Sequence, residues 1–213
     1  MKIAGFFWST GVIFALSLST AFGQTSSTTP SGTTPSATPA TQPPPTIQQR
    51  KRNQQNRIAN GIDNGSLTAG ETKKLEKGEA NLNQEERAMR AGDGGKLTSA
   101  DRTALNQQQN SLSKQIYADK HNANTAHYGN GEIGQRRENQ QDRIAQGIRS
   151  GQMTPGEAAR TEKKEQGINR EVAGMRQANG GKLTKGDRRV VNQQQNQVSK
   201  QIYKQKHNDK KGF

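Results

Sequence analysis

A stretch of 70 residues is written twice in this chain. When the sequence is shifted by 86 positions, residues 53–122 align with 139–208 without a gap, and 39 of the 70 positions are identical. This period is long for the unit of a solenoid protein. We therefore expect two small homologous domains, at 47–122 and 139–208, joined by a linker over 123–138 and followed by a basic tail at 209–213.

Start and stop signals within each copy predict three helices. In the first copy, Thr68 is followed three residues later by Glu71, which is the spacing of a capping box. In this motif the hydroxyl and the carboxylate each accept a hydrogen bond from a backbone N–H near the helix start. Gly94 and Gly95 then favour a helix end. Strand-like alternation is absent, so the sequence predicts an all-α fold of two tandem three-helix repeats with EF-hand-like helix–loop–helix elements.

The composition limits the size of the core. Hydrophobic residues make up 27% of the chain, aromatic residues make up 4%, and Cys is absent. These values exclude a multi-span membrane protein, a disulfide scaffold and a thiolate metal site. Each copy holds about eleven sizeable apolar side chains, which gives a domain of this size only marginal stability. We expect packing of the copies, a homodimer or another partner to add the rest.

The first 46 residues read as export and spacer segments. Residues 1–23 combine Lys2, a short apolar stretch and small residues before Gly23, which is typical of a signal peptide cleaved after Gly23. Residues 24–46 are almost wholly Ser, Thr, Pro, Ala, Gly and Gln, a composition that predicts a disordered tether. We expect a protein in the periplasm or outside the cell, with no membrane span after cleavage.

Calcium loops are the first chemical candidate. Four windows of twelve residues place Gly at position six and an acid at position twelve, as EF-hand loops do: 60–71, 90–101, 146–157 and 176–187. None has a carboxylate at positions one, three or five, where Ca²⁺ takes oxygen ligands. Tight calcium binding is therefore not expected, and no cofactor is predicted. The alternative is weak Ca²⁺ binding, for which the best ligand set is Asn60, Asn64, Thr68 and Glu71.

Two segments carry a resemblance to a known type of protein. The first is residues 140–160, Gln-Gln-Asp-Arg-Ile-Ala-Gln-Gly-Ile-Arg-Ser-Gly-Gln-Met-Thr-Pro-Gly-Glu-Ala-Ala-Arg. The second is residues 200–208, Lys-Gln-Ile-Tyr-Lys-Gln-Lys-His-Asn. Both resemble uncharacterised secreted bacterial proteins with tandem, degenerate EF-hand-like helix–loop–helix repeats. The resemblance implies the helical fold and export, and it implies no activity.

Positive charge is concentrated in the second copy. The chain has 32 Lys and Arg against 18 Asp and Glu. Residues 53–122 hold 10 basic and 9 acidic side chains, whereas residues 139–208 hold 14 and 6. A positive face attracts polyanions by releasing their counterions. The predicted polyanion-binding residues are Arg160, Lys163, Lys164, Lys200, Lys204 and Lys206. A solvated face of a very soluble protein would have the same composition.

The third helix of each copy is the most similar segment. Residues 106–122 match 192–208 at 13 of 17 positions, many of them polar. Side-chain amides offer paired donors and acceptors, which suit a sugar, a peptide backbone or each other. We expect an exposed partner-binding or glycan-binding face, made of Asn106, Gln109, Asn110, Asn192, Gln195 and Asn196. Recent duplication explains the same identity without a partner.

Catalytic patterns are absent from the sequence. His121 and His207 stand at equivalent helix ends, where the helix dipole favours a cation. Tyr117 and Tyr203 follow an apolar residue and are expected to border the core. No phosphate-binding loop or nucleophile motif is present. We therefore expect a non-enzymatic binding or structural protein of the cell envelope, whose basic second copy contacts an anionic polysaccharide, an acidic protein or a nucleic acid. A regulatory protein with weak divalent-ion binding is the alternative, and an unrecognised enzyme comes third.

Overall fold

The computed structural model describes residues 43–213, which form one compact unit. The predicted signal peptide at 1–23, and the predicted tether up to residue 42, lie outside the described residues. Within residues 43–213 the secondary structure is entirely helical, with no strand. The helices are α1 (Ile47–Asp63), α2 (Ala69–Gly92), α3 (Ser99–Lys120), α4 (Glu132–Arg149), α5 (Pro155–Ala178) and α6 (Lys185–Lys206). The prediction of an all-α fold is confirmed.

The helix boundaries follow the capping residues of the sequence. Five helices begin with a capping box, in which a threonine hydroxyl accepts a hydrogen bond from the N3 amide and the N3 side chain accepts one from the threonine N–H. Helix α5 also has Pro155 in its first turn. Proline has no backbone N–H, but the helix makes no use of an N–H at this position. The bounds of α5 and α6 equal those of α2 and α3 plus 86. The fourth helix starts at Glu132, inside the predicted linker, with Gly131 as its N-cap.

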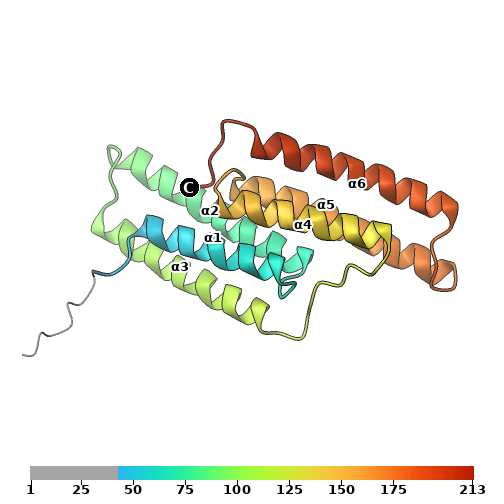
Figure 1. Ribbon diagram of the computed structural model, residues 1–213. Helices are drawn as coiled ribbons and strands as arrows, with labels where there is room; N and C mark the ends of the chain where they lie inside the picture. Colours follow the sequence, from blue (N-terminus) through green and yellow to red (C-terminus); the bar gives the residue numbers. More distant parts are fainter. Residues whose placement is uncertain (1–42) are drawn as a thin grey trace, which may run out of the picture. The chain divides into compact units, whose positions relative to one another are not determined.

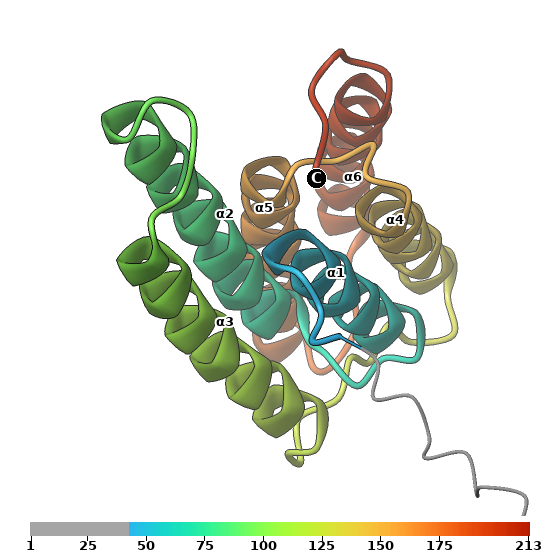
Figure 2. The same cartoon turned by 90° about the vertical axis from the view of Figure 1, so that its left-hand side faces the viewer.

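Helices α1, α2, α4 and α5 form a central group, and α3 and α6 pack on it from outside. Helices α1 and α2 of the first half lie against α4 and α5 of the second half. Helix α3 contacts only α1 and α2 among the described helices, and α6 contacts only α4 and α5. Figures 1 and 2 show α3 and α6 on opposite sides of this central group. The two halves therefore pack together within one compact unit.

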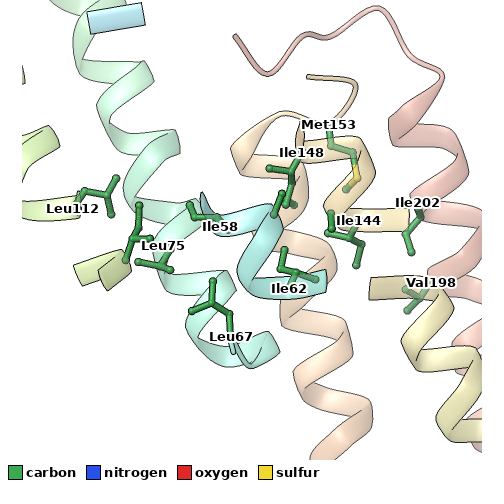
Figure 3. Close-up of a cluster of buried hydrophobic side chains, with 14 of the residues drawn as sticks. Ile58, Ile62, Leu67, Leu75, Leu112, Ile144, Ile148, Met153, Val198 and Ile202 are labelled. Carbon is green, nitrogen blue, oxygen red and sulfur yellow. The ribbon is translucent and has the colours of Figure 1, made fainter. Parts of the chain in front are cut away.

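Apolar side chains from both halves join in one core. Ile58 and Ile62 of α1 and Ile144 and Ile148 of α4 are at most 1% exposed. Figure 3 shows these isoleucines between α2 on one side and α6 on the other. The core cluster extends from Leu112 of α3 to residues of α6 without a break. Burial across the two halves thus supplies apolar contacts that neither half has alone.

The loop between the first two helices of each half is closed by an apolar plug. Leu67 is fully buried, and its N–H donates to the Gly61 oxygen at 2.9 Å. A Cβ on Gly61 would lie 2.6 Å from the Leu67 side chain, so only glycine allows this approach. Met153 and Gly147 repeat the arrangement in the second half, at 2.9 Å for the hydrogen bond. In each loop a backbone hydrogen bond fixes the buried side chain against the preceding helix.

One ion pair joins the two halves at corresponding positions. Residue 149 is residue 63 plus 86, and Arg149 of α4 forms an ion pair with Asp63 of α1. The same guanidinium donates to Asn60 Oδ1 at 3.0 Å. Corresponding residues of the two copies therefore face each other where α1 and α4 cross, as an approximate two-fold arrangement requires.

Within residues 43–213, none of the helices combines the length and the apolar character that crossing a bilayer requires.

Because the two halves share one core, they should unfold together. We expect Ile58→Ala in the first half and Ile144→Ala in the second each to lower the free energy of unfolding by about 2–5 kcal/mol. Urea denaturation followed by circular dichroism should show one transition that moves as a whole in both variants. A transition that splits in two, with one part unmoved, would contradict a shared core.

Candidate functional site

Five of the six predicted polyanion-binding residues are exposed on α5 and α6. We call Arg160, Lys163, Lys164, Lys200 and Lys204 the basic face. Among residues 43–213, no ion pair involves any of these five side chains. Their charges are therefore available to an external anion, as a polyanion-binding surface requires.

The two rows of cations are joined where α5 packs on α6. Thr161 Oγ1 donates to Gln205 Oε1 at 2.7 Å and accepts from Gln201 Nε2 at 3.1 Å. Each of these three residues is the chain neighbour of a member of the basic face, since Thr161 follows Arg160, and Gln201 and Gln205 follow the two lysines of α6. The contact therefore holds the part of α5 that carries Arg160 against the part of α6 that carries Lys200 and Lys204.

The sixth predicted residue, Lys206, does not belong to this surface. Its Nζ donates to Gln146 Oε1 of α4 at 2.7 Å, on the other side of α6. Burial and the nearby charge of Arg143 lower the pKa of Lys206. Lys206 therefore ties α6 to α4, and the prediction that it joins the polyanion site finds no geometric support.

The corresponding surface of the first half is less positive. Lys74, Lys77 and Lys114 correspond to three members of the basic face, but Gly78 and Ala118 stand in place of Lys164 and Lys204. In addition, Asp119 stands in place of Gln205. Burial raises the pKa of Asp119, as does Glu71, whereas Lys74 acts in the opposite direction. An acid thus interrupts the first surface where an amide lies in the second.

An exposed aromatic side chain adjoins the basic face. Tyr203 is 59% exposed and Tyr117 is 61% exposed, so the expectation that these tyrosines border the core is wrong. Tyr203 stacks on His207 with ring centroids 4.1 Å apart, and His207 Nδ1 lies 2.7 Å from the Tyr203 oxygen. Since Tyr203 follows Lys200 by three positions, the two side chains are neighbours on the surface of α6.

The asparagines of the predicted partner-binding face accept hydrogen bonds from arginines of the protein, although Asn110 and Asn196 are exposed as expected. Arg50 of α1 donates to Asn106 Oδ1 at 3.1 Å and to Asn110 Oδ1 at 2.8 Å. In the second half Arg136 donates in the same way to Asn192, at 3.5 Å, and to Asn196. These asparagines therefore hold the third helix of each half against the first.

The two glutamines of that predicted face are buried, so the expectation that they are exposed is wrong. Gln109 is 2% exposed and Gln195 is fully buried. Gln109 Nε2 donates to the Ile47 oxygen at 3.0 Å, while its own backbone oxygen accepts from Gln54 Nε2 at 2.7 Å. Gln195 makes the corresponding contacts with Ile133 and Gln140, at 2.9 and 2.7 Å. Packing between helices accounts for the identity of these glutamines, but not for that of exposed residues such as Gln107 and Lys114.

The predicted calcium ligands of the first loop already have protein partners. Glu71 accepts hydrogen bonds from Thr68, at 2.7 and 2.9 Å, and from Asn122 and Asn124, at 2.8 and 3.0 Å. Burial acts to raise the pKa of Glu71, but these hydrogen bonds outweigh it and lower the pKa. Asn60 and Asn64 turn to other groups, since Asn60 Oδ1 accepts from Arg149 at 3.0 Å and Asn64 Oδ1 from the Ser66 N–H at 3.0 Å. Thr68 and Glu71 thus cap α2, whereas Asn60 and Asn64 accept hydrogen bonds from other groups.

A group of buried glutamates, which the sequence interpretation missed, lies on α2 and α5. The glutamate cluster consists of Glu76, Glu79, Glu162 and Glu165, each at most 1% exposed. Gln55 Nε2 donates to Glu76, and Gln141 Nε2 to Glu162, both at 3.3 Å. Oε1 of all four carboxyl groups has no hydrogen-bond partner. The signal was present, because a Glu-x-x-Glu spacing recurs at the same place in both copies and puts both acids on one helix face.

These carboxyl groups hold protons more tightly than exposed glutamates do. Burial raises the pKa of Glu79 to about 8, although Lys51 acts against the rise. Burial also raises the pKa of Glu165 to about 7, with Arg137 opposing it. Burial and neighbouring carboxylates raise the pKa of Glu76 and Glu162.

Across residues 43–213, no three His, Asp or Glu side chains are grouped so that they could hold a metal ion.

Comparison with protein-family models, with curated proteins and with solved structures finds no match to this chain.

The glutamate cluster should make the protein less stable as the pH rises. The usual pKa of a glutamate is 4.5, so between about 4.5 and 8 the folded protein holds protons that the unfolded chain has released. Because the unfolded state binds fewer protons there, the free energy of unfolding falls with increasing pH. Urea denaturation at several pH values across this interval measures the slope.

Removing two of the four carboxyl groups provides the control. We expect Glu79→Gln combined with Glu165→Gln to reduce this slope, while the stability near pH 4.5 stays close to that of the unaltered protein, since both carboxyl groups are protonated there. Equal slopes in the two proteins would show that the glutamate cluster does not set the pH dependence.

Proposed function

We propose that this is a non-enzymatic binding protein that uses the basic face on α5 and α6 to bind an anionic polymer of the cell envelope. The observation that carries the proposal is the grouping of five exposed cations without an ion-pair partner in the described part of the chain. Binding at such a face gains free energy mainly from release of counterions from the polymer. Catalysis has no part in this proposal.

An anionic polysaccharide fits the surroundings of the face better than a nucleic acid does. Tyr203 offers one exposed ring beside the cations, and aromatic rings with a polar edge suit ligands that are partly apolar and partly wet. Single-stranded nucleic acids instead take a series of rings on which successive bases stack. Among the described residues, Tyr117 and Tyr203 are the only large aromatic side chains that are exposed, and they belong to different halves.

The place of action is also a proposal. Residues 1–23 are expected to direct export, and residues 24–46 to act as a spacer. A spacer of this length would let the helical unit reach polymer in the envelope at some distance from the N-terminal end of the spacer. This supports a role in the periplasm or outside the cell.

Matched substitutions in the two halves test the proposal. We expect the triple variant Arg160→Gln, Lys163→Gln and Lys200→Gln to elute from heparin at clearly lower salt than the unaltered protein. The slope of log affinity against log salt should also decrease, by up to about three counterions. Heparin is used as a defined polyanion, and envelope polysaccharide, acidic protein and DNA are then compared with it at equal salt.

The control is the triple variant at the corresponding positions of the first half. Lys74→Gln, Lys77→Gln and Lys114→Gln remove the same formal charge from equally exposed sites. We expect this variant to elute close to the unaltered protein. If both triple variants shift equally, net charge alone explains retention, and the proposal of a specific face is wrong.

A further inference from the structure

Two clefts lie at corresponding places in the two halves. The first cleft has a volume of about 480 Å³ and is lined by Lys51, Asn83, Glu86, Arg90 and the segment 211–213, among other residues. The second cleft has a volume of about 330 Å³. Its lining includes the residues 86 positions further along the chain: Arg137, Asn169, Val172 and Arg176. The segment 125–128 covers it as 211–213 covers the first.

In the first cleft, a carboxylate of the protein neutralises two cations. Glu86 Oε2 forms an ion pair with Lys51 Nζ, and Glu86 Oε1 accepts from Arg90 Nη2 at 2.9 Å and from Arg90 Nε at 3.0 Å. Burial acts to raise the pKa of Glu86, but the hydrogen bonds and charges of Lys51 and Arg90 lower it. The first cleft thus contains its own anion, held between two positive side chains.

In the second cleft the two cations remain, and the counterpart of the Glu86 carboxylate is missing. Arg137 corresponds to Lys51 and Arg176 to Arg90, whereas Val172 stands in place of Glu86. Arg137 is only 8% exposed, yet among residues 43–213 its guanidinium makes no side-chain hydrogen bond or ion pair. Its guanidinium carbon lies 5.3 Å from the centre of the Tyr128 ring. Glu165 is the nearby acid, but it does not pair with Arg137, and a buried guanidinium without a paired anion is costly.

Two residues that line the second cleft have a buried oxygen without a partner, as Glu79 and Asn83 do in the first half. Glu165 is 1% exposed and its Oε1 has no hydrogen-bond partner, and Oδ1 of Asn169 has none either. Glu165 lies near Arg137 without pairing with it, just as Glu79 lies near Lys51, which pairs with Glu86 instead. These oxygens can accept hydrogen bonds from donors on a ligand.

We propose that the second cleft binds a small organic acid, whose carboxylate takes the place that the Glu86 carboxylate takes in the first cleft. Arg137 and Arg176 hold the carboxylate, because a guanidinium matches a carboxylate with two parallel hydrogen bonds. The Tyr128 ring and Val172 contact the body of the ligand. Asn169 Oδ1 and Glu165 Oε1 accept from hydroxyl or amino groups next to the carboxylate.

The chemistry of the cleft defines the class of ligand. A carboxylate with neighbouring hydroxyl or amino groups is found in sugar acids, hydroxy acids and amino acids. The volume is at the lower end of the range for small-molecule sites, which suits a single sugar-sized molecule. None of the residues of the basic face lines this cleft, so the inference does not rest on the proposed polymer binding.

Calorimetry with glucuronate tests this inference. We expect one binding site per chain, an increase in melting temperature with glucuronate, and weaker binding of inorganic phosphate at equal concentration. Acetate should bind more weakly than glucuronate, because it lacks the hydroxyl groups that Asn169 and Glu165 would accept from. Absence of carboxylate binding, or phosphate binding as tight as that of glucuronate, would overturn the inference.

Exchanging residues between the two clefts gives the decisive variants. We expect Val172→Glu to place an internal carboxylate between Arg137 and Arg176, to weaken glucuronate binding about tenfold or more, and to raise the melting temperature by about 2–4 °C. Binding that is unchanged in Val172→Glu would overturn the inference, and so would a lower melting temperature.

The reverse exchange, Glu86→Val, supplies a second measurement. It should lower the melting temperature, create a second glucuronate site in the first cleft, and recover part of the lost stability when glucuronate is added. If stoichiometry stays at one and added ligand has no effect on stability, the two clefts are not equivalent in the way proposed. The Arg160, Lys163 and Lys200 triple variant should keep full glucuronate affinity, which separates this inference from the polymer-binding proposal.

Discussion

Hydrogen bonds from buried glutamine amides to backbone oxygens are the interaction on which the rest of this structure depends. Gln54 and Gln140 each reach across to the third helix of their half, and Gln109 and Gln195 reach back to the start of the first. Each of these four amides donates through its Nε2, while its Oε1 has no hydrogen-bond partner. These contacts let a chain with 27% hydrophobic residues bury long helices against each other.

The boundaries of the helices could be predicted from the sequence, because their signals are local. Thr68 with Glu71, and Thr154 with Glu157, need only each other and the adjacent backbone to start a helix. Similarly, Gly94 has a positive φ of 62°, as its place after the second helix predicts. Start and stop signals of this kind remain readable even when the apolar pattern is weak.

The packing of the halves and the polar sites could not be predicted in the same way. An amide such as that of Gln109 has the same chemistry at a surface and between helices, and only the position of Ile47 decides which it is. Likewise, Glu76 and Glu162 are charged residues that a sequence pattern places at the surface. They are buried because α2 packs on α5. Interpretation by residue type alone therefore assigned buried amides to the surface and overlooked the buried acids.

Each half completes a cleft of the other. Thr154–Gly156 of the second half lie over the first cleft, and Thr68 and Ala69 of the first half lie over the second. The covering segments are held in matching ways, since the Ala126 N–H donates to the Gly65 oxygen at 2.8 Å and the Gly212 N–H to the Gly151 oxygen at 2.9 Å. Corresponding segments thus surround two clefts that differ in charge, because Glu86 lies in the first cleft and Val172 in the second.

The pairing of Asp63 with Arg149 has a consequence for the history of the chain. If a single repeat assembled with an identical copy around the same axis, this position would meet itself, and an acid or a base there would repel its own image. Fusion of two copies removes that restriction, because each copy is then free to mutate alone. Opposite charges at one equivalent position are therefore a mark of joined genes, and they favour the association of unlike halves over that of like ones.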